Sequence, residues 1–371
     1  MTPLPAAILP PGVASRILPG INGLDMHILE AGRPDAPLLL LLHGFPELAW
    51  SWRAVLPALA RAGYHVVAPD QRGYGRTLGW VAEYDGDLAP YRMANLARDA
   101  FGLVRALGHD SVACVVGHDF GASVAGWSAL LRPDFYRAVV LMSAPFTGAP
   151  ALPAPPAPDI DIDTALAALP RPRKHYQRYY ATRPANADMT AAAQGLPAFL
   201  RAYYHHKSAD WPGNDPVPLT GWTAEELAKM PTYYVMDLAA DMAATVAAVM
   251  PSPEQVAACR WLTEPELAVY AGEFARTGFQ GGLNWYRCRF EPRFTAEQQL
   301  HAGRTIDIPA MFLAGRHDWG IQQSPGALAR MQQRAFTNMG PPVLIDGAGH
   351  WVQQEQPQAV AVALLAFLGR I

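Results

Sequence analysis

A five-residue segment of this chain has the glycine spacing of a sharp turn that presents a reactive side chain. The segment is Gly117-His118-Asp119-Phe120-Gly121, and it stands where a strand-like apolar run gives way to a helical pattern. In the pattern G-x-nucleophile-x-G, small residues permit a strained turn that exposes the central side chain. Serine is usual at the centre, but here the residue is Asp119. A carboxylate attacks a saturated carbon and forms an alkyl ester, which water must then hydrolyse.

Hydrolysis of such an ester requires a general base and a group that orients it. His350, in GAGHWV after the last predicted strand, is the expected base, and Asp318, in GRHDWG after the preceding strand, is the expected orienting acid. The strand predicted over 138–144 ends without a carboxylate, which favours Asp318. The oxyanion formed during hydrolysis needs two backbone N–H donors. We expect these from Phe120, directly after the nucleophile, and from Phe45 in HGFP.

Strand and helix patterns alternate in the parts of the chain that carry these residues. Short apolar runs bounded by turn residues predict buried strands, and apolar residues at helical spacing predict the helices between them. The predicted strands are 38–42, 65–70, 111–119, 138–144, 309–318 and 342–350, and the predicted helices are 52–62, 95–107, 121–131 and 359–369. This alternation predicts an α/β fold, a mostly parallel sheet with helices on both faces. The candidate catalytic residues then lie at the carboxyl ends of strands, the edge at which open α/β sheets bind ligands.

The alternation breaks off between about residues 145 and 305. Eight of the 35 prolines fall within 145–172, and aromatic-rich and alanine-rich helical stretches follow. Stiff, extended proline-rich chain suits a connector. We therefore expect a core domain made of residues 1–146 and 306–371, and an inserted helical cap domain over 147–305 that begins with a proline-rich linker.

Five motifs together resemble the epoxide hydrolase and haloalkane dehalogenase branch of the α/β-hydrolase superfamily. The resemblance covers roughly residues 37–145 and 305–370 and implies the α/β-hydrolase fold, with the insertion as its cap. It also implies a cis peptide bond before Pro46, from the family's HGxP feature. The order nucleophile, acid, histidine along the chain is the order of this fold. The motifs are HGFPE (43–47), DQRGYG (70–75), GHDFG (117–121), GRHDWG (315–320) and GAGHW (347–351).

In the epoxide hydrolases of this branch, two cap tyrosines hydrogen-bond the epoxide oxygen and protonate the leaving alkoxide. The stretch GLNWYR (282–287) resembles the segment that bears one of them, so Tyr286 is expected as the first ring-opening acid. Tyr176, followed by Gln177 in HYQRYY, resembles the other. Further tyrosines compete for this second role: Tyr179, Tyr180, Tyr203 and Tyr204.

Two alternatives within the branch differ in how they hold a leaving group or a substrate. Haloalkane dehalogenases usually hold the halide with a Trp after the nucleophile and an Asn or Trp beside the HG motif. This chain has Phe120 and Phe45 there, whose side chains have no N–H donor. Fluoroacetate-type dehalogenases clamp a carboxylate with Arg residues one and four positions after the nucleophile, where this chain has Phe120 and Ser123. An esterase would need Ser or Cys at position 119.

The composition excludes several classes of protein. The chain has 371 residues, of which 51% are hydrophobic and 16% charged, unlike a disordered chain. Its 29 Lys+Arg against 32 Asp+Glu argue against nucleic-acid binding. The apolar runs, 38–42 among them, are far short of the ~20 residues that span a bilayer, so no membrane partner is expected. Three widely spaced cysteines and an N-terminus broken by prolines favour the cytoplasm. The cysteines are Cys114, Cys259 and Cys288.

The sequence therefore predicts an epoxide hydrolase that requires no cofactor and no metal. Its expected partners are a small apolar epoxide and water, with a vicinal diol as product. A dehalogenase with the same three catalytic residues is the alternative, and a non-catalytic hydrolase-fold binding protein is a third hypothesis. A homodimer is one assembly the chain could form, and the sequence leaves its oligomeric state open.

Three side predictions concern residues outside the proposed machinery. Arg72 is expected to pair with a carboxylate in a structural role. Adjacent His205 and His206 lack the spacing of metal ligands, so they are expected to be solvated residues of the cap. Aromatic residues of the insertion predict a mostly apolar pocket. They are Trp211, Trp222, Phe279 and Trp285.

Overall fold

A computed structural model describes residues 1–153 and 161–371, and an eight-stranded sheet forms its centre. The strand order is β1-β2-β4-β3-β5-β6-β9-β10. β2 runs antiparallel to both of its neighbours, and the remaining pairs are parallel, which confirms the predicted mostly parallel sheet. The strands are β1 (Val13–Ile21), β2 (Leu24–Ala31), β3 (Leu38–Leu42), β4 (His65–Pro69), β5 (Cys114–His118), β6 (Val139–Met142), β9 (Ala310–Gly315) and β10 (Val343–Ile345).

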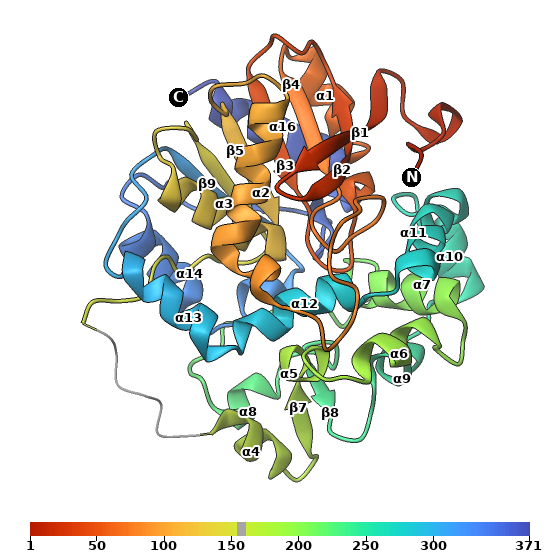
Figure 1. Cartoon of the computed structure of the whole chain (residues 1–371). Coiled ribbons are helices and arrows are strands. Elements are labelled where there is room, and N and C mark those ends of the chain that lie inside the picture. Colours follow the sequence, from red (N-terminus) through yellow and green to blue (C-terminus); the bar gives the residue numbers. More distant parts are fainter. Residues whose placement is uncertain (154–160) are drawn as a thin grey trace.

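Helices cover both faces of this sheet (Figure 1). α2 packs with α3 and α1 packs with α16, and each pair contacts the sheet. Because both faces are covered, all five leucines of β3 are buried. The helices outside the insertion are α1 (Leu56–Arg61), α2 (Met93–Ala106), α3 (Phe120–Leu131), α14 (Ala327–Arg330), α15 (Val352–Glu355) and α16 (Pro357–Leu368). Short helical turns are η1 (Ala6–Ile8), η2 (Ala49–Trp52), η3 (Ala89–Tyr91), η5 (Trp319–Ile321) and η6 (Met331–Ala335).

The sequence did not predict two of the strands, and it predicted one helix longer than the structure has it. β1 and β2 precede the first predicted strand; β1 lies at the sheet edge, contains Pro19 and Gly20, and has only one buried residue. Proline and glycine are depleted from strands, so the pattern of an edge strand of this kind is weak. The helix predicted over 52–62 is divided into η2 and α1, because Pro57 is tolerated only in the first turn of a helix.

Between β6 and β9 the chain leaves the sheet and forms a mostly helical insertion. In Figure 1 this insertion, coloured green to cyan, gathers below the sheet. Part of the expected proline-rich linker, residues 154–160, lies outside the described residues. A small antiparallel pair of strands, β7 and β8, was not predicted. The elements are α4 (Ile162–Ala167), β7 (Arg173–His175), α5 (Tyr176–Tyr180), α6 (Ala185–Thr190), α7 (Leu196–Lys207), α8 (Ala224–Leu227), β8 (Val235–Asp237), α9 (Met242–Ala247), α10 (Pro253–Ala258), α11 (Glu264–Thr277), α12 (Gln280–Arg289), α13 (Pro292–Gln298) and η4 (Gln299–His301).

Helix α7 lies inside this insertion and packs against α9 and α11. Its residues His205 and His206 are only 7% and 1% exposed, so the prediction that they are solvated is wrong. The reason is tertiary packing: the His206 ring lies edge-on to the rings of Trp211 and Tyr233. Across residues 1–153 and 161–371, no cluster of three or more His, Cys, Asp or Glu could hold a metal ion. Within the same ranges, every helix is too short or too polar to cross a bilayer.

Candidate active site

Asp119 lies in the sharp turn between β5 and α3. Its backbone angles, φ 52° and ψ −119°, are in a region that costs a non-glycine residue energy. The two glycines of the motif make the turn possible. A Cβ on Gly117 would overlap the backbone of Gly121, and a Cβ on Gly121 would overlap the carbonyl oxygens of Leu42 and His43 at the end of β3. The glycine spacing therefore serves the purpose that the sequence predicted for it.

The structure brings the three predicted residues of the catalytic set into one row. His350 Nε2 lies 3.3 Å from Asp119 Oδ2. On the other side of the ring, His350 Nδ1 lies 3.1 and 3.2 Å from the two carboxylate oxygens of Asp318. Asp318 Oδ1 also accepts a hydrogen bond from the N–H of Gly320, at 2.6 Å. The end of β6 offers Ser143 rather than a carboxylate, as predicted.

Backbone N–H groups surround Asp119 at the expected positions. The Phe45 N–H donates to Asp119 Oδ1 at 3.0 Å. Phe120 is the first residue of α3, so its N–H has no acceptor within the helix and lies at the positive end of the helix dipole. The Phe45–Pro46 peptide bond is cis, as the resemblance implied.

The charges in this row favour an ionised nucleophile. Burial on its own raises the pKa of Asp119, but the imidazole of His350, with Lys207 and His118, outweighs burial and lowers that pKa below its usual value. Burial likewise raises the pKa of Asp318, and the neighbouring His350 outweighs it and lowers that pKa. Both carboxyl groups are therefore anionic near neutral pH, as a nucleophile and an orienting acid require.

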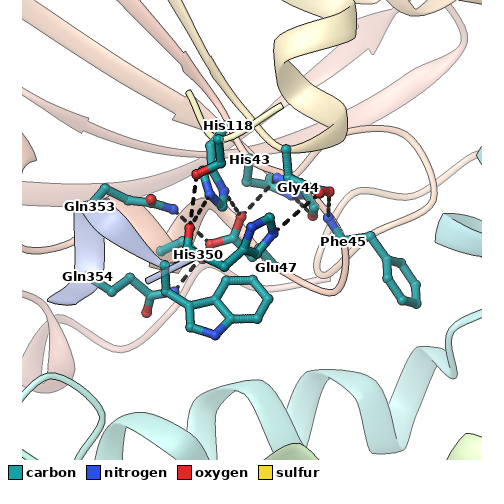
Figure 2. A network of polar contacts seen from close by, with 12 residues as sticks. His43, Gly44, Phe45, Glu47, His118, His350, Gln353 and Gln354 are labelled. Atoms are coloured by element: carbon teal, nitrogen blue, oxygen red, sulfur yellow. Dashed lines mark hydrogen bonds and ion pairs between the residues drawn. The ribbon is translucent and has the colours of Figure 1, made fainter. Parts of the chain in front are cut away.

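A second polar network lies behind His350 (Figure 2). Glu47 and His118 of this network stand in two sequence motifs, but nothing in the sequence predicts their contact. His118 Nδ1 lies 2.5 Å from Glu47 Oε2, and His118 Nε2 lies 2.7 Å from the carbonyl oxygen of His350. Both ring nitrogens therefore face acceptors, which requires a proton on each. Burial lowers the pKa of His118, but the Glu47 carboxylate outweighs it and raises that pKa. Glu47 Oε1 accepts hydrogen bonds from the amides of Gln353 and Gln354, at 2.8 and 3.2 Å.

Tyr286 and Tyr176 line a cavity of about 120 Å³ together with Asp119. Their ring centres are 6.0 Å apart. Burial raises the pKa of both phenols, so both carry their protons near neutral pH. Tyr286 comes from α12 and packs edge-on to Phe120 and Phe45, with ring centres 5.0 and 5.5 Å away. The two tyrosines expected as ring-opening acids thus line the same cavity as the carboxylate.

The competing tyrosines do not line this cavity, and three of them donate their hydroxyl protons to the protein. Tyr179 donates to Asp188, Tyr180 to the hydroxyl of Tyr203, and Tyr204 to the carbonyl of Pro46. The Tyr176 hydroxyl also has a partner: it donates to Gln323 Oε1 and accepts from Gln177 Nε2, each at 3.0 Å. Because Tyr176 lines the cavity, it is favoured over its competitors as the second ring-opening acid. Its hydroxyl must rotate away from Gln323 before it can donate to a substrate.

A larger cavity, of about 320 Å³, adjoins the first between the insertion and the core. The two cavities share Phe120, Ser123 and Arg289 among their lining residues. Of the aromatic residues expected around the pocket, Trp285 lines the larger cavity and Trp222 the smaller one. The others pack elsewhere: Trp211 lies against His206, and Phe279 stacks on Phe274. Polar side chains line both cavities beside the aromatic ones, so the prediction of a mostly apolar pocket is wrong.

Arg72 has the structural role that the sequence predicted. Its guanidinium donates to both oxygens of Asp99, at 2.7 and 2.8 Å. The pair is buried and ties the loop after β4 to α2. It does not line either of the two cavities beside Asp119.

This fold and this row of side chains define an α/β hydrolase with an aspartate at the nucleophile position. A family model for the alpha/beta hydrolase fold matches residues 37–217. Epoxide hydrolase A of Mycobacterium tuberculosis is 36% identical to the chain, over 96% of this chain and 98% of that protein. An epoxide hydrolase of Caballeronia sordidicola is 30% identical, over 94% of this chain and 91% of that protein. A solved structure of an epoxide hydrolase from an endophytic Streptomyces superposes with a TM-score of 0.76 at 30% identity, covering 97% of this chain and 96% of its own.

The chain therefore belongs to the epoxide hydrolase family of the α/β-hydrolase fold.

Proposed function

We propose that the protein hydrolyses an epoxide to a vicinal diol in two steps, through an ester on Asp119. The observation that carries this proposal is the single cavity of about 120 Å³ that has Asp119 on one wall and two phenols, Tyr286 and Tyr176, elsewhere in its lining. A carboxylate can attack an epoxide carbon while a phenol protonates the oxygen that leaves. No side-chain N–H donor stands at the Phe45 and Phe120 positions, where a dehalogenase would hold its halide.

In the first step, one oxygen of Asp119 forms a bond to an epoxide carbon as the ring C–O bond breaks. Tyr286, assisted by Tyr176, gives its proton to the alkoxide. In the second step, His350 takes a proton from water, and the resulting hydroxide attacks the ester carbonyl. Asp318 holds the His350 ring and stabilises its positive charge. The N–H groups of Phe45 and Phe120 stabilise the oxyanion.

The ester oxygen then leaves as the second hydroxyl of the diol. His350 returns its proton to that oxygen, and Asp119, released as a carboxylic acid, loses the remaining proton to the solvent, so both the base and the nucleophile are restored. The phenolate of the first step regains its proton from the solvent. No cofactor and no metal takes part in this proposal.

The insertion, residues 147–305, acts in this proposal as the cap domain of the site. It supplies both phenols and part of the wall of the adjoining cavity of about 320 Å³. A water molecule occupies about 30 Å³ in the liquid, so the smaller cavity holds little more than the reacting part of a substrate. We infer that a substituent of the epoxide extends past Phe120 into the larger cavity, where aromatic side chains and the polar Ser123 and Arg289 both line the wall. We also place the protein in the cytoplasm, as its cysteine pattern suggested.

A substrate panel tests this function. An aryl epoxide, an aliphatic trans-epoxide, a bromoalkane and a haloacetate are each offered to the wild type and to Asp119→Ala. We expect diol from at least one epoxide with the wild type and none with Asp119→Ala. Halide release without diol formation would instead establish the dehalogenase alternative, and binding without turnover would favour a non-catalytic protein.

A further inference from the structure

A buried lysine of the insertion lies next to the loop that carries His350. Lys207 is the last residue of α7 and is 3% exposed. Its Nζ lies 5.0 Å from the ring centre of Tyr234 and 5.2 Å from that of Trp351. The ring centres of Tyr203 and Tyr233 are 5.6 and 5.8 Å away. Aromatic rings within about 6 Å attract a cation, so four rings contribute to holding this ammonium.

The ammonium has no direct polar partner in residues 1–153 and 161–371. It has neither a hydrogen bond nor a carboxylate oxygen within 4.0 Å. Burying an ion without compensation is strongly unfavourable. Burial lowers the pKa of Lys207, and the carboxylates of Asp119, Asp318 and Glu47 act against that lowering from a longer range. The negative charges that compensate Lys207 are therefore those of the candidate active site.

The backbone around Lys207 fixes its place relative to His350. The carbonyl of Lys207 accepts a hydrogen bond from the N–H of His350 at 2.9 Å. Gly349 packs so closely that a Cβ there would lie 2.7 Å from the same carbonyl oxygen. Trp351 Nε1 donates to the carbonyl of Tyr204, in the same helix, at 2.8 Å. The end of α7 and the His350 loop thus form one fixed unit that spans the insertion and the core.

We propose that Lys207 is a positioning residue that acts through its charge: its ammonium helps to keep Asp119 ionised before the ester forms and opposes protonation of His350 after it has formed. This inference rests on the proposed function. Once Asp119 has become an uncharged ester, the ammonium still opposes protonation of His350, which must be neutral to take a proton from water. An uncharged group of the same length should therefore raise the pH below which ester hydrolysis slows.

Other titratable groups also face Lys207 or the carboxylates around it, and they are unchanged when Lys207 alone is replaced. The buried tyrosines among them have pKa values raised by burial, so they stay neutral near pH 7. The groups are Tyr203 and His206 on α7, Tyr233 and Tyr234 before β8, Glu47 after β3, His118 and Asp119 at the end of β5, Asp318 after β9, His350 after β10, and Glu355 on α15. Glu355 accepts hydrogen bonds from the N–H groups of Ala209, Gly349 and Trp351, and burial raises its pKa to about 8, so it titrates within the tested range in every variant.

The test measures ester formation and ester hydrolysis separately in single turnovers between pH 5 and 9. Lys207→Met keeps most of the length of the side chain and removes its charge, and Lys207→Arg keeps the charge. We expect the acid limb of ester hydrolysis to move up by about one pH unit in Lys207→Met, the order of effect of a nearby unit charge at an effective dielectric constant of about 20. Lys207→Arg should keep the acid limb close to that of the wild type.

The matched control is Lys174→Met. Lys174 also holds its ammonium over a tyrosine ring, 5.0 Å from the centre of Tyr179, but it lines neither cavity beside Asp119. The acid limb of ester hydrolysis in Lys174→Met should match that of the wild type. A folded Lys207→Met with an unmoved limb would overturn the inference, even if its melting temperature changed. If Lys207→Met does not fold, the acid limb of ester hydrolysis is compared between Lys207→Gln and Lys207→Arg. Equal limbs in these two variants would likewise overturn the inference.

The failure of this inference differs from the failure of the proposed function. If the wild type forms no ester, the proposed function is wrong and the Lys207 inference falls with it. If the wild type forms the ester but the acid limb is the same with and without the charge at position 207, only the inference about Lys207 is wrong.

Discussion

The core and the insertion hold their parts of the candidate site by different means. On the core side, Asp119, His350 and Asp318 follow strands. The contact between Asp119 and His350, the hydrogen bond between His350 and Asp318, and hydrogen bonds from the main chain fix their positions. On the insertion side, Tyr286 and Tyr176 lie among aromatic rings. The carboxylates and the imidazole are thus positioned by the strand ends and turns of the sheet. Tyr286 is positioned by aromatic packing, and Tyr176 by packing together with hydrogen bonds to Gln177 and Gln323. Substitutions in the core and in the insertion should therefore affect different steps of the reaction.

The largest effect is expected on the core side, from His350→Gln. Without its base the enzyme should still form the ester but hydrolyse it slowly, so turnover should fall about 10³-fold, within the usual range for a general base. Intact-mass spectrometry after mixing with an epoxide should show one alkyl group per chain. A variant that loses turnover without accumulating the ester would contradict the division of roles between Asp119 and His350.

A smaller effect is expected on the insertion side, from Tyr286→Phe. Loss of the phenol should slow ester formation about 10²-fold, because one ring-opening acid is missing, and should leave ester hydrolysis nearly unchanged. Stopped-flow single turnovers separate the two steps. Tyr180→Phe is the control, since the Tyr180 hydroxyl donates to Tyr203 and Tyr180 does not line the cavity. Equal rates of ester formation in Tyr286→Phe and the wild type would remove Tyr286 from the mechanism.

The attachment of the two regions can be weakened at Arg53. This core residue donates to Glu266 at 2.9 Å and to the carbonyl of Trp261 at 2.7 Å, both in the insertion. Arg53→Met should lower the free energy of unfolding by about 2 kcal/mol, since it leaves a partly buried carboxylate without its partner. Urea unfolding measures the change.

The control for that change is an exposed ion pair. Arg132 and Asp134 form one on the core surface, with side chains 42% and 64% exposed. Arg132→Met should change the free energy of unfolding by less than about 1 kcal/mol. If Arg53→Met is no more destabilising than Arg132→Met, then this contact does not help to hold the two regions together.

The smallest effect concerns the dependence of stability on pH. The folded pKa of His118 is raised above 6.5, mainly by Glu47 acting against burial. A raised folded pKa gives stability that is present below pH 6.5 and is lost as the pH rises through the folded value. Glu47→Gln removes the cause, so its free energy of unfolding should fall less than that of the wild type between pH 6 and 9. If the free energy of unfolding of Glu47→Gln fell as steeply with pH as that of the wild type, groups other than His118 would cause the pH dependence.

The core half of the site is predictable from the sequence because local patterns determine it. Asp119, His350 and Asp318 each follow an apolar run, and parallel strands bring their carboxyl ends to one edge. The spacing of Gly117 and Gly121 is enough to predict the turn between them. Strand β1 was not predicted, because an edge strand that contains proline and glycine has no continuous apolar run.

The insertion half depends on packing between segments far apart in the sequence, so the sequence alone described it less well. Tyr176 was chosen by resemblance, but nothing in the sequence placed Gln323 against its hydroxyl. His206 and Lys207 were missed because charged or polar residues in a helix predict a solvated face, and only the tertiary structure shows aromatic rings around them. Glu47 and His118 stood in recognised motifs, yet their ion pair joins residues 71 positions apart.

The most direct test of the central claim is a single turnover in ¹⁸O-water with enzyme in excess over epoxide. If Asp119 is the nucleophile, the diol takes its second oxygen from the carboxylate. The first diol should then be unlabelled, and mass spectrometry of the peptide that contains Asp119 should show one ¹⁸O. A first diol that carries ¹⁸O, together with an unlabelled Asp119, would show that water attacks the epoxide directly and would contradict the ester mechanism.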